Sequence, residues 1–350
     1  MKIINLEREA LKAFRDCLQE IPFITVEREV TELYSTEARY DFRTILQVKG
    51  KNLVFIVEAK KNGEPRYARQ AVNQLIRYLA DSPNAYGVFI APYISPEAAK
   101  ICQQANIGTI DFAGNCNIVF GSVFIQKEGN PNPYTRKRYL RSLYSPKAER
   151  ILRVLILAGP QEWKVEQLAN EADVSLGLVS NVKKLLTDRD WIDAQTFGFY
   201  LTEPFALLEE WSQHYNYRRN EVLEFYTLLD VGEFEYKLEQ ICQQKDIRYG
   251  LTGFSGAARY APTVRYKRAM AYISRNLEDV IASLELKAVG SGANVNLLIP
   301  YDEGVFYQTQ DIEAAQIVSP VQTYLDLMRV RGRGEEAAES LLDNVIRRLW

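Results

Sequence analysis

Histidine is almost absent from this chain of 350 residues, and cysteine is rare. The one histidine is His214, and the four cysteines never form a C-x-x-C pair: Cys17, Cys102, Cys116 and Cys242. Structural zinc sites need four Cys or His ligands at short spacings, and a histidine-based triad needs a His that activates a nucleophile. We therefore expect neither kind of site.

Long apolar runs are also missing. No run reaches the roughly 20 residues that span a membrane, and the first ten residues, MKIINLEREA, lack the apolar core of a secretory signal. The formal net charge is -2, 47% of the residues are hydrophobic and 25% are charged, as in a globular chain of two or three domains. We expect a soluble, cytoplasmic protein with reduced thiols and no membrane contact.

Basic residues gather in one segment, between Pro131 and Arg150, where Glu149 is the only acidic residue. The segment contains these basic residues: Arg136, Lys137, Arg138, Arg141, Lys147 and Arg150. Tyrosines are interleaved with them. The cluster predicts either an arm that contacts phosphates or a solvated linker, and both interpretations stay open.

Two strands joined by a turn are predicted between Asp41 and Lys60, because apolar, strand-like runs flank the turn signal K-G-K-N. If Gly50 and Lys51 form the tip, the numbers of facing residues sum to about 101. Asp41 then lies opposite Lys60 and diagonal to Glu58. Glu58 and Lys60 share one face of their strand, since side chains alternate between faces.

This cluster suggests phosphodiester hydrolysis with a divalent cation. Asp41 and Glu58 offer the oxygen ligands that Mg²⁺ or Mn²⁺ prefers, and the backbone carbonyl of Ala59 is a further candidate ligand. Lys60 would position the attacking water and offset charge on the phosphate. The alternative is structural, with Asp41 at a strand end and Glu58 in a surface ion pair with Lys60. An E-x-K spacing alone does not decide between the two.

The order of these residues resembles the PD-(D/E)xK nuclease superfamily: Asp41, then Glu58-Ala59-Lys60, then a helix. That helix carries the Q-x-x-x-Y spacing of the RecB-like branch, from Gln74 to Tyr78. The resemblance implies an α/β, restriction-endonuclease-like mixed sheet and a hydrolase that acts on DNA. It implies these catalytic residues: Asp41, Glu58, Lys60 and Gln74. It also implies these metal ligands: Asp41, Glu58 and Ala59.

Two details of the resemblance stay open. Tyr40 stands where the family name has a proline, at a position that varies in the superfamily. An acidic residue of the first helix, Glu7 or Glu9, is a candidate to assist the site, and the sequence does not say which.

The surrounding pattern predicts the element order α-β-β-β-α-β-α-β for residues 1–128. The first helix is expected at 6–18, the next at 65–79, and a third after Ser95, which caps it with Pro96 at its first position. Asp111 ends the last predicted strand. It lies either near the site or in a turn with the Gly-Asn pair that follows.

A basic linker is predicted at 129–149, and residues 150–204 resemble a winged helix-turn-helix. A first apolar helix begins near Ile151, a second follows Lys164, and Ser175 caps a third helix that ends at Leu186. In DNA-binding members of this fold the third helix enters the major groove. The resemblance implies these DNA contacts: Ser175, Gly177, Ser180, Asn181, Lys183 and Lys184, with Thr196 and Phe197 at the wing tip and Arg136, Lys137 and Arg138 in the linker. A spacer or dimerisation role is the alternative.

Residues 205–350 are predicted to be mixed α/β. Several stretches resemble the AbiE-type antitoxins of type IV toxin-antitoxin systems, in order: 251–256, 292–302, 318–327 and 331–339. The resemblance implies repression of the protein's own promoter and antagonism of a nucleotidyltransferase toxin. A nuclease-like domain in front of such a region is a departure from the family.

Three hypotheses follow. The first is an Mg²⁺-dependent DNA endonuclease, targeted by the winged helix, in phage or mobile-element defence. The second is a DNA-binding regulator or antitoxin that keeps the nuclease fold as a scaffold. The third is an adaptor that binds a protein partner through the C-terminal domain. A homodimer is expected for the first, because two cuts on a duplex need two sites.

Overall fold

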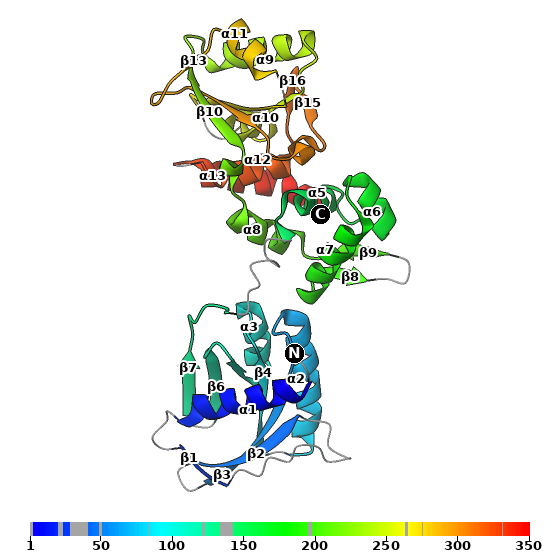
Figure 1. Ribbon diagram of the computed structural model, residues 1–350, viewed down its shortest axis with the longest axis vertical. Coiled ribbons are helices and arrows are strands. Elements are labelled where there is room, and N and C mark those ends of the chain that lie inside the picture. The colour runs from blue at the N-terminus through cyan, green and yellow to red at the C-terminus, as the bar shows by residue number, and fades with distance from the viewer. Residues whose placement is uncertain are drawn as a thin grey trace. The chain divides into compact units, whose positions relative to one another are not determined.

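A computed structural model describes residues 3–19, 24–28, 41–48, 51–82, 84–120, 123–133, 143–194, 198–262, 265–274, 276–330 and 332–350. The chain divides into two compact units, the first made of Met1–Tyr139 with Thr187–Asp190 and the second of Leu140–Leu186 and Trp191–Trp350. Each unit contains a sheet of seven strands (Figure 1). The predicted mixed α/β class is confirmed.

The first unit follows the predicted element order and adds a hairpin at its end. Its helices are α1 (Ile3–Gln19), α2 (Pro65–Ala80) and α3 (Pro96–Gln104). Its strands are β1 (Ile24–Arg28), β2 (Phe42–Val48), β3 (Lys51–Ala59), β4 (Ala85–Ala91), β5 (Gly108–Asp111), β6 (Cys116–Phe120) and β7 (Val123–Lys127). They lie in the order β1 to β7; β3, β4 and β5 are parallel, and the flanking pairs are antiparallel.

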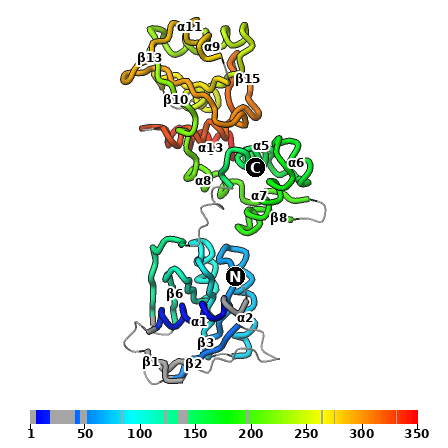
Figure 2. Tube along the Cα trace, viewed as in Figure 1, coloured from blue at the N-terminus to red at the C-terminus, as the bar shows by residue number. Residues whose placement is uncertain are grey.

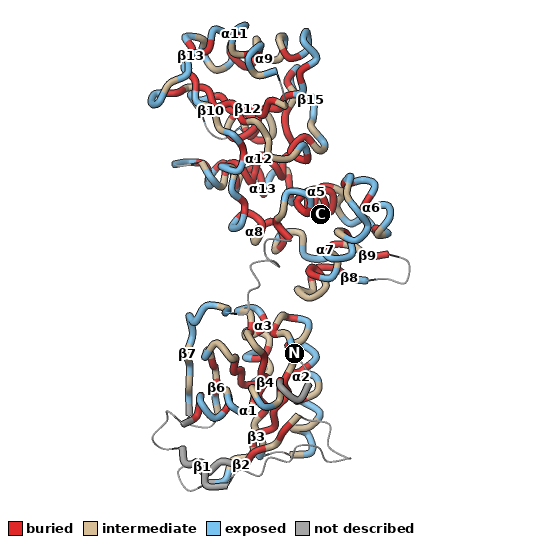
Figure 3. The backbone as a smooth tube through the Cα atoms, viewed as in Figure 1, coloured by how far each residue is buried: buried red, intermediate tan, exposed pale blue. Residues whose placement is uncertain are grey.

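Helices cover both faces of this sheet (Figure 1). Phe55 and Val57 of β3 belong to the core beneath α1, whereas Ile56 belongs to the core beneath α2 and α3. Buried residues run along β3 and β4, as Figure 3 shows. Because side chains alternate along a strand, Glu58 continues the face that α2 covers.

The predicted register of the β2–β3 hairpin was wrong by two residues. The strands pair from Phe42 with Val57 to Val48 with Lys51, so the numbers of facing residues sum to 99. Lys51 is part of β3 and not of the turn. Continuing the register places Asp41 opposite Glu58, which brings the two carboxylates closer together than the predicted diagonal.

The second unit begins with three helices and a hairpin at the predicted places. They are α5 (Pro146–Leu157), α6 (Val165–Glu171), α7 (Leu176–Asp188), β8 (Ile192–Ala194) and β9 (Phe199–Leu201). The predicted cap of α7 is confirmed, because Leu178 N donates to Ser175 Oγ at 3.3 Å. Asp173, in the turn before it, has a φ of 51°. The assignment of this segment as a DNA-binding winged helix stays a prediction.

The remainder is built on the second large sheet, in the order β13-β10-β14-β12-β11-β16-β15. Its strands are β10 (Glu221–Tyr226), β11 (Tyr249–Leu251), β12 (Ala269–Ile273), β13 (Lys287–Ala288), β14 (Val295–Ile299), β15 (Gln310–Ile312) and β16 (Ala315–Ile317). Its helices are α8 (Pro204–His214), α9 (Val231–Gln244), α10 (Gly253–Tyr260), α11 (Leu277–Ser283), α12 (Pro320–Leu327) and α13 (Gly334–Asn344). Short 3-10 helices are η1 (Tyr217–Arg219), η2 (Glu303–Phe306) and η3 (Ile346–Leu349).

One hydrophobic core joins α5–α7 to the C-terminal helices. Leu152 of α5, Val179 of α7, Leu325 of α12 and Leu341 of α13 are fully buried in it. The C-terminal end of the chain lies beside α5, where Trp350 Nε1 donates to Ile156 O at 3.1 Å (Figure 2). The segments predicted at 150–204 and 205–350 therefore pack against each other through shared apolar surface.

Candidate functional site

Two acidic side chains meet at the ends of β2 and β3. Asp41 stands directly before β2, and its backbone N–H donates to Val57 O at 3.2 Å. Its carboxylate Oδ2 accepts a hydrogen bond from Ala59 N at 2.6 Å. The Asp41 side chain is therefore held against the last residues of β3, where Glu58 lies.

Lys60 links Glu58 to helix α2. Its Nζ donates to Glu58 Oε1 at 2.5 Å and to Gln74 Oε1 at 2.7 Å. Glu58 is only 3% exposed and the Lys60 side chain is 22% exposed, so this ion pair is partly buried and not a fully exposed surface pair. The structure thus brings together the side chains of Glu58, Lys60 and Gln74, with Asp41 attached through Ala59.

Burial makes these carboxyls hard to ionise. It raises the pKa of Glu58 to about 7, and the neighbouring Asp41 adds to the rise although the Lys60 ammonium opposes it. Burial also raises the pKa of Asp41, against the Ala59 N–H and Lys60, and Glu7 of α1 contributes in the same upward direction. Glu9, the other acidic candidate on the first helix, lines a separate pocket.

One oxygen in this cluster has no protein partner. Glu58 Oε2 is buried and accepts no hydrogen bond, a costly state for a charged oxygen. A hard cation would satisfy that oxygen and oppose both upward pKa shifts, so the donor set of Asp41, Glu58 and the Ala59 carbonyl fits Mg²⁺ or Mn²⁺. Within the described residues no group of three or more His, Cys, Asp or Glu side chains is placed to hold a metal. Water and phosphate would therefore have to complete the coordination.

Sequence reasoning missed Arg43, whose Nε is buried without a hydrogen-bond partner. Arg43 is the second residue of β2 and follows Asp41 by two positions. Because side chains alternate along a strand, both lie on the same face of the sheet. This two-residue spacing was the signal available in the sequence. Asp111, in contrast, has the turn role that was one of its two interpretations. Its carboxylate accepts from Asn115 N and Asn115 Nδ2, both at 2.9 Å, and from Ile94 N at 3.3 Å.

The predicted DNA contacts on α7 form a partly exposed face. Gly177, Ser180, Asn181 and Lys184 are exposed at helical spacing, opposite a buried row that contains Val182. Lys184 is the basic residue of that exposed face.

Three of the predicted contacts on or next to α7 are engaged within the protein. Ser175 Oγ caps the helix, and Ser180 Oγ donates to Leu176 O at 3.0 Å. Lys183 is half-buried, with its Nζ 4.8 Å from the centre of the Phe199 ring. The remaining predicted contacts, in the linker and at the wing tip, lie outside the described residues: Arg136, Lys137, Arg138, Thr196 and Phe197.

A second buried polar cluster lies in the other unit, around Asp326 of α12. Its Oδ1 accepts from Tyr215 Oη at 2.7 Å and from Tyr272 Oη at 3.0 Å, and its Oδ2 accepts from Thr252 Oγ1 at 2.6 Å. Gln322 donates to both oxygens at 3.2 Å.

This cluster extends to α5 through Arg153. The Arg153 guanidinium is 1% exposed and donates to Gln322 Oε1, from Nε at 3.1 Å and from Nη2 at 2.5 Å. Glu149, one turn earlier, lies 3.9 Å from Arg153 and 3.3 Å from Arg219. Polar contacts thus connect the predicted DNA-binding segment to α12.

A comparison with protein families matches residues 200–347 to the family described as "Transcriptional regulator, AbiEi antitoxin, Type IV TA system". The AbiE-type resemblance of this region is confirmed. Gln322 and Asp326, both fully buried, fall in one of the stretches that carry the resemblance. The match covers less than half of the chain and includes neither the first unit nor α5–α7.

Neither the curated proteins nor the solved structures gave a match to the chain. In the described part of the chain, every helix is too short or too polar to cross a membrane.

Proposed function

We propose that this protein is a DNA-binding transcriptional regulator of the AbiE antitoxin type, in which α7 contacts DNA. The observation that carries the proposal is the family match at 200–347, in a unit whose core also holds the three-helix segment with the exposed face of α7. A regulator needs its DNA-reading helix to be fixed to the part that receives a signal. Here shared apolar packing and the Arg153–Gln322 contacts fix it.

The exposed face of α7 suits a groove-binding helix. Asn181 offers an amide that can pair with adenine, and Lys184 offers a cation for a phosphate or a guanine. Gly177 has nothing within 4 Å of an added Cβ, so the backbone there can approach a ligand closely. Each lysine that contacts a phosphate adds about one unit to the dependence of log affinity on log salt.

Promoter binding tests this role. The full chain would be titrated against a DNA fragment from upstream of its own gene and against a scrambled fragment, at several salt concentrations. We expect tighter binding to the promoter fragment, without cleavage when divalent cations are chelated. Equal affinity for both fragments would contradict the proposal that the protein is a transcriptional regulator.

The antitoxin role has a separate test. If a nucleotidyltransferase toxin is encoded alongside, its expression should arrest growth and co-expression of this chain should restore it. A chain truncated after residue 199 keeps α7 but loses the region that matches the family, so it should not restore growth. Full rescue by the truncated chain would contradict the assignment.

We propose a second function for the first unit, metal-dependent hydrolysis of DNA phosphodiesters. The contacts among Glu58, Lys60 and Gln74, beside Asp41 and with one unsatisfied Glu58 oxygen, favour it specifically. A surface ion pair would be exposed and would not need Gln74 to hold the lysine. Mg²⁺, when bound, would act as a Lewis acid on the phosphate.

The protein groups in this second proposal have distinct tasks. Asp41 and Glu58 would hold the cation through carboxylate oxygens. Gln74 accepts a hydrogen bond from Lys60 and so holds the ammonium beside Glu58. Lys60 then orients the attacking water and offsets charge on the phosphate.

Purified protein with plasmid, linear and single-stranded DNA, with and without Mg²⁺, tests this activity. We expect Mg²⁺-dependent nicking or linearisation. Binding without any cleavage in Mg²⁺ or Mn²⁺ would leave the first unit as a scaffold and would not affect the regulator proposal.

A further inference from the structure

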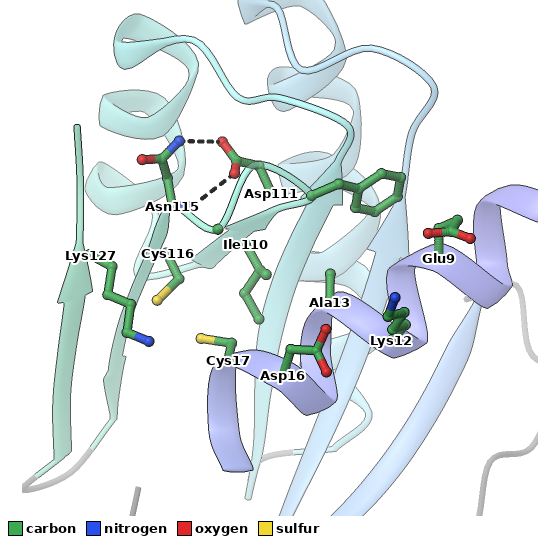
Figure 4. A pocket seen from close by; sticks show the side chains of 12 residues that line it. Glu9, Lys12, Ala13, Asp16, Cys17, Ile110, Asp111, Asn115, Cys116 and Lys127 are labelled. Atoms are coloured by element: carbon green, nitrogen blue, oxygen red, sulfur yellow. Dashed lines mark hydrogen bonds between the residues drawn. The ribbon is translucent and has the colours of Figure 1, made fainter. Parts of the chain in front are cut away.

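A polar pocket in the first unit lies apart from the carboxylate cluster. It has a volume of about 320 Å³ and lies between α1 and the ends of β5, β6 and β7. Glu9, Lys12 and Asp16 of α1 line one side, and Asp111, Asn115 and Lys127 line the other (Figure 4). Small polar molecules can therefore enter the space that these side chains line.

Two thiols belong to this lining. Cys17 comes from the last turn of α1 and Cys116 from the first position of β6, and each lines the pocket. Figure 4 shows both sulfur atoms on the same side of the pocket. Residues almost a hundred positions apart in the chain thus line one pocket and belong to one hydrophobic core.

The surroundings of this pair favour thiolate chemistry. The hydrogen bond with Cys17 lowers the pKa of the Cys116 thiol, against its burial, and the nearby Lys127 ammonium acts in the same direction as the hydrogen bond. A thiolate is the form of cysteine that reacts with oxidants.

The other two cysteines provide an internal contrast. Burial raises the pKa of Cys102 to about 12, and it raises the pKa of Cys242 to about 12 as well. All four thiols are buried in hydrophobic cores. Cys102 lies beneath α2 and α3 and Cys242 beside the second sheet, and neither lines the pocket. They should stay reduced under conditions that oxidise a reactive thiol.

We propose that Cys17 and Cys116 are a redox-active pair that hydrogen peroxide converts to a disulfide. The Cys116 thiolate attacks one peroxide oxygen, the O–O bond breaks, hydroxide leaves and a sulfenic acid forms. The Cys17 thiol then attacks that sulfur, the S–O bond breaks, and the hydroxyl group leaves as water with the thiol proton. The thiols lose two electrons in total and the peroxide gains them.

The product would tie α1 to β6. Because the bond closes a loop of about 100 residues, it restricts the unfolded chain strongly. α1 also carries Glu7, whose negative charge contributes to the raised pKa of Asp41. Oxidation would therefore fix the helix that borders the carboxylate cluster.

Mass spectrometry of the full chain tests the proposal. Reduced protein is treated with hydrogen peroxide, blocked with N-ethylmaleimide, digested without reductant and searched for linked peptides. We expect a Cys17–Cys116 linked peptide that disappears after dithiothreitol, while Cys102 and Cys242 remain thiols. We also expect the unfolding midpoint of the first unit to rise by roughly 10 °C on oxidation.

Two variants sharpen the test. In Cys17→Ser no partner remains, so Cys116 should accumulate as sulfenic acid, which dimedone captures. Cys102→Ser should leave formation of the disulfide unchanged. The proposal fails if wild-type protein yields no linked peptide, or if Cys102 and Cys242 oxidise as fast as Cys116.

Discussion

The two buried polar clusters of this protein differ in one respect, which is whether every oxygen has a partner. Asp326 in the second unit accepts hydrogen bonds on both oxygens from four side chains: Thr252, Tyr215, Tyr272 and Gln322. Glu58 in the first unit has Lys60 on one oxygen and nothing on the other. Both are almost completely buried.

This difference separates a structural cluster from a candidate ligand site. A buried network in which every polar atom is hydrogen-bonded holds its helices and strands in one arrangement. A buried oxygen without a hydrogen-bond partner destabilises the folded state, and a ligand that binds it removes that destabilisation. The Asp326 cluster joins α5 to α12, and the Glu58 cluster lies where two strands end. The comparison therefore predicts different responses to mutation, pH and metal in the two units.

The largest effect should come from Lys60→Ala. If the Glu58 cluster is catalytic, removal of the ammonium should lower the rate of DNA cleavage about 1000-fold, equal to about 4 kcal/mol, with DNA affinity nearly unchanged. Single-turnover cleavage and binding by fluorescence anisotropy would measure both. Lys61→Ala, at the exposed neighbouring position, is the matched control. Equal loss of cleavage and binding would mean that Lys60 only binds DNA.

Asp326→Ala should destabilise the second unit by about 3 kcal/mol, because it leaves several buried donors without an acceptor. All four tryptophans, Trp163, Trp191, Trp211 and Trp350, lie in that unit, so tryptophan fluorescence during urea unfolding reports on it alone. Asp311→Ala, at an exposed position, should change the stability by less than about 0.5 kcal/mol. A similarly small effect of Asp326→Ala would show that the network does not stabilise the unit.

Glu58 should make the first unit less stable at high pH. Its pKa in the folded protein is about 7, above the ordinary 4.5, so the folded state holds the proton more tightly than the unfolded state. The stabilisation is complete below pH 4.5 and is lost as the pH rises through 7, with a difference of up to roughly 3 kcal/mol.

Calorimetry at pH 5 and pH 8 tests this pH dependence, with the Glu58→Gln variant and with added Mg²⁺. The variant should be more stable than wild type at pH 8 and similar to it at pH 5. Mg²⁺ should stabilise wild type at pH 8 and not the variant. Glu97→Gln, an exposed position on α3, controls for the loss of a carboxylate. No response of wild type to Mg²⁺ would make the Glu58 cluster structural, like that of Asp326.

The smallest effect is expected for the double change of Lys183 and Lys184 to Ala. Promoter affinity should fall roughly tenfold, and the salt slope should fall by one to two units. Lys183 should contribute less than Lys184, since its ammonium stacks on Phe199. Lys267→Ala, an exposed change elsewhere in the unit, is the control. Unchanged affinity would exclude α7 as the helix that contacts DNA.

Much of the first unit could be predicted from local patterns. Period-two and apolar runs marked the strands, and Ser95 with Pro96 marked the start of α3, where Ser95 Oγ accepts from Ala98 N. The hairpin register was wrong, because a four-residue turn signal does not fix which two residues lie at the tip. That choice depends on how β2 packs against the rest of the sheet.

The buried polar cluster of the second unit could not be predicted from the sequence. The polar residues Arg153, Gln322 and Asp326 lie far apart in the chain, and no spacing rule connects them. Only the packing of α5 against α12 explains why buried helices carry them. The same holds for Cys17 and Cys116, which look like scattered cysteines until α1 and β6 are placed together.

The sequence by itself determined the elements, the Asp41, Glu58, Lys60 and Gln74 set and the AbiE-like stretches, because each of these depends on residue types at short spacing. The tertiary structure decided which buried charges are satisfied, since a hydrogen bond between distant elements exists only after they pack. It left one Glu58 oxygen without a partner and gave Asp326 donors on both of its oxygens.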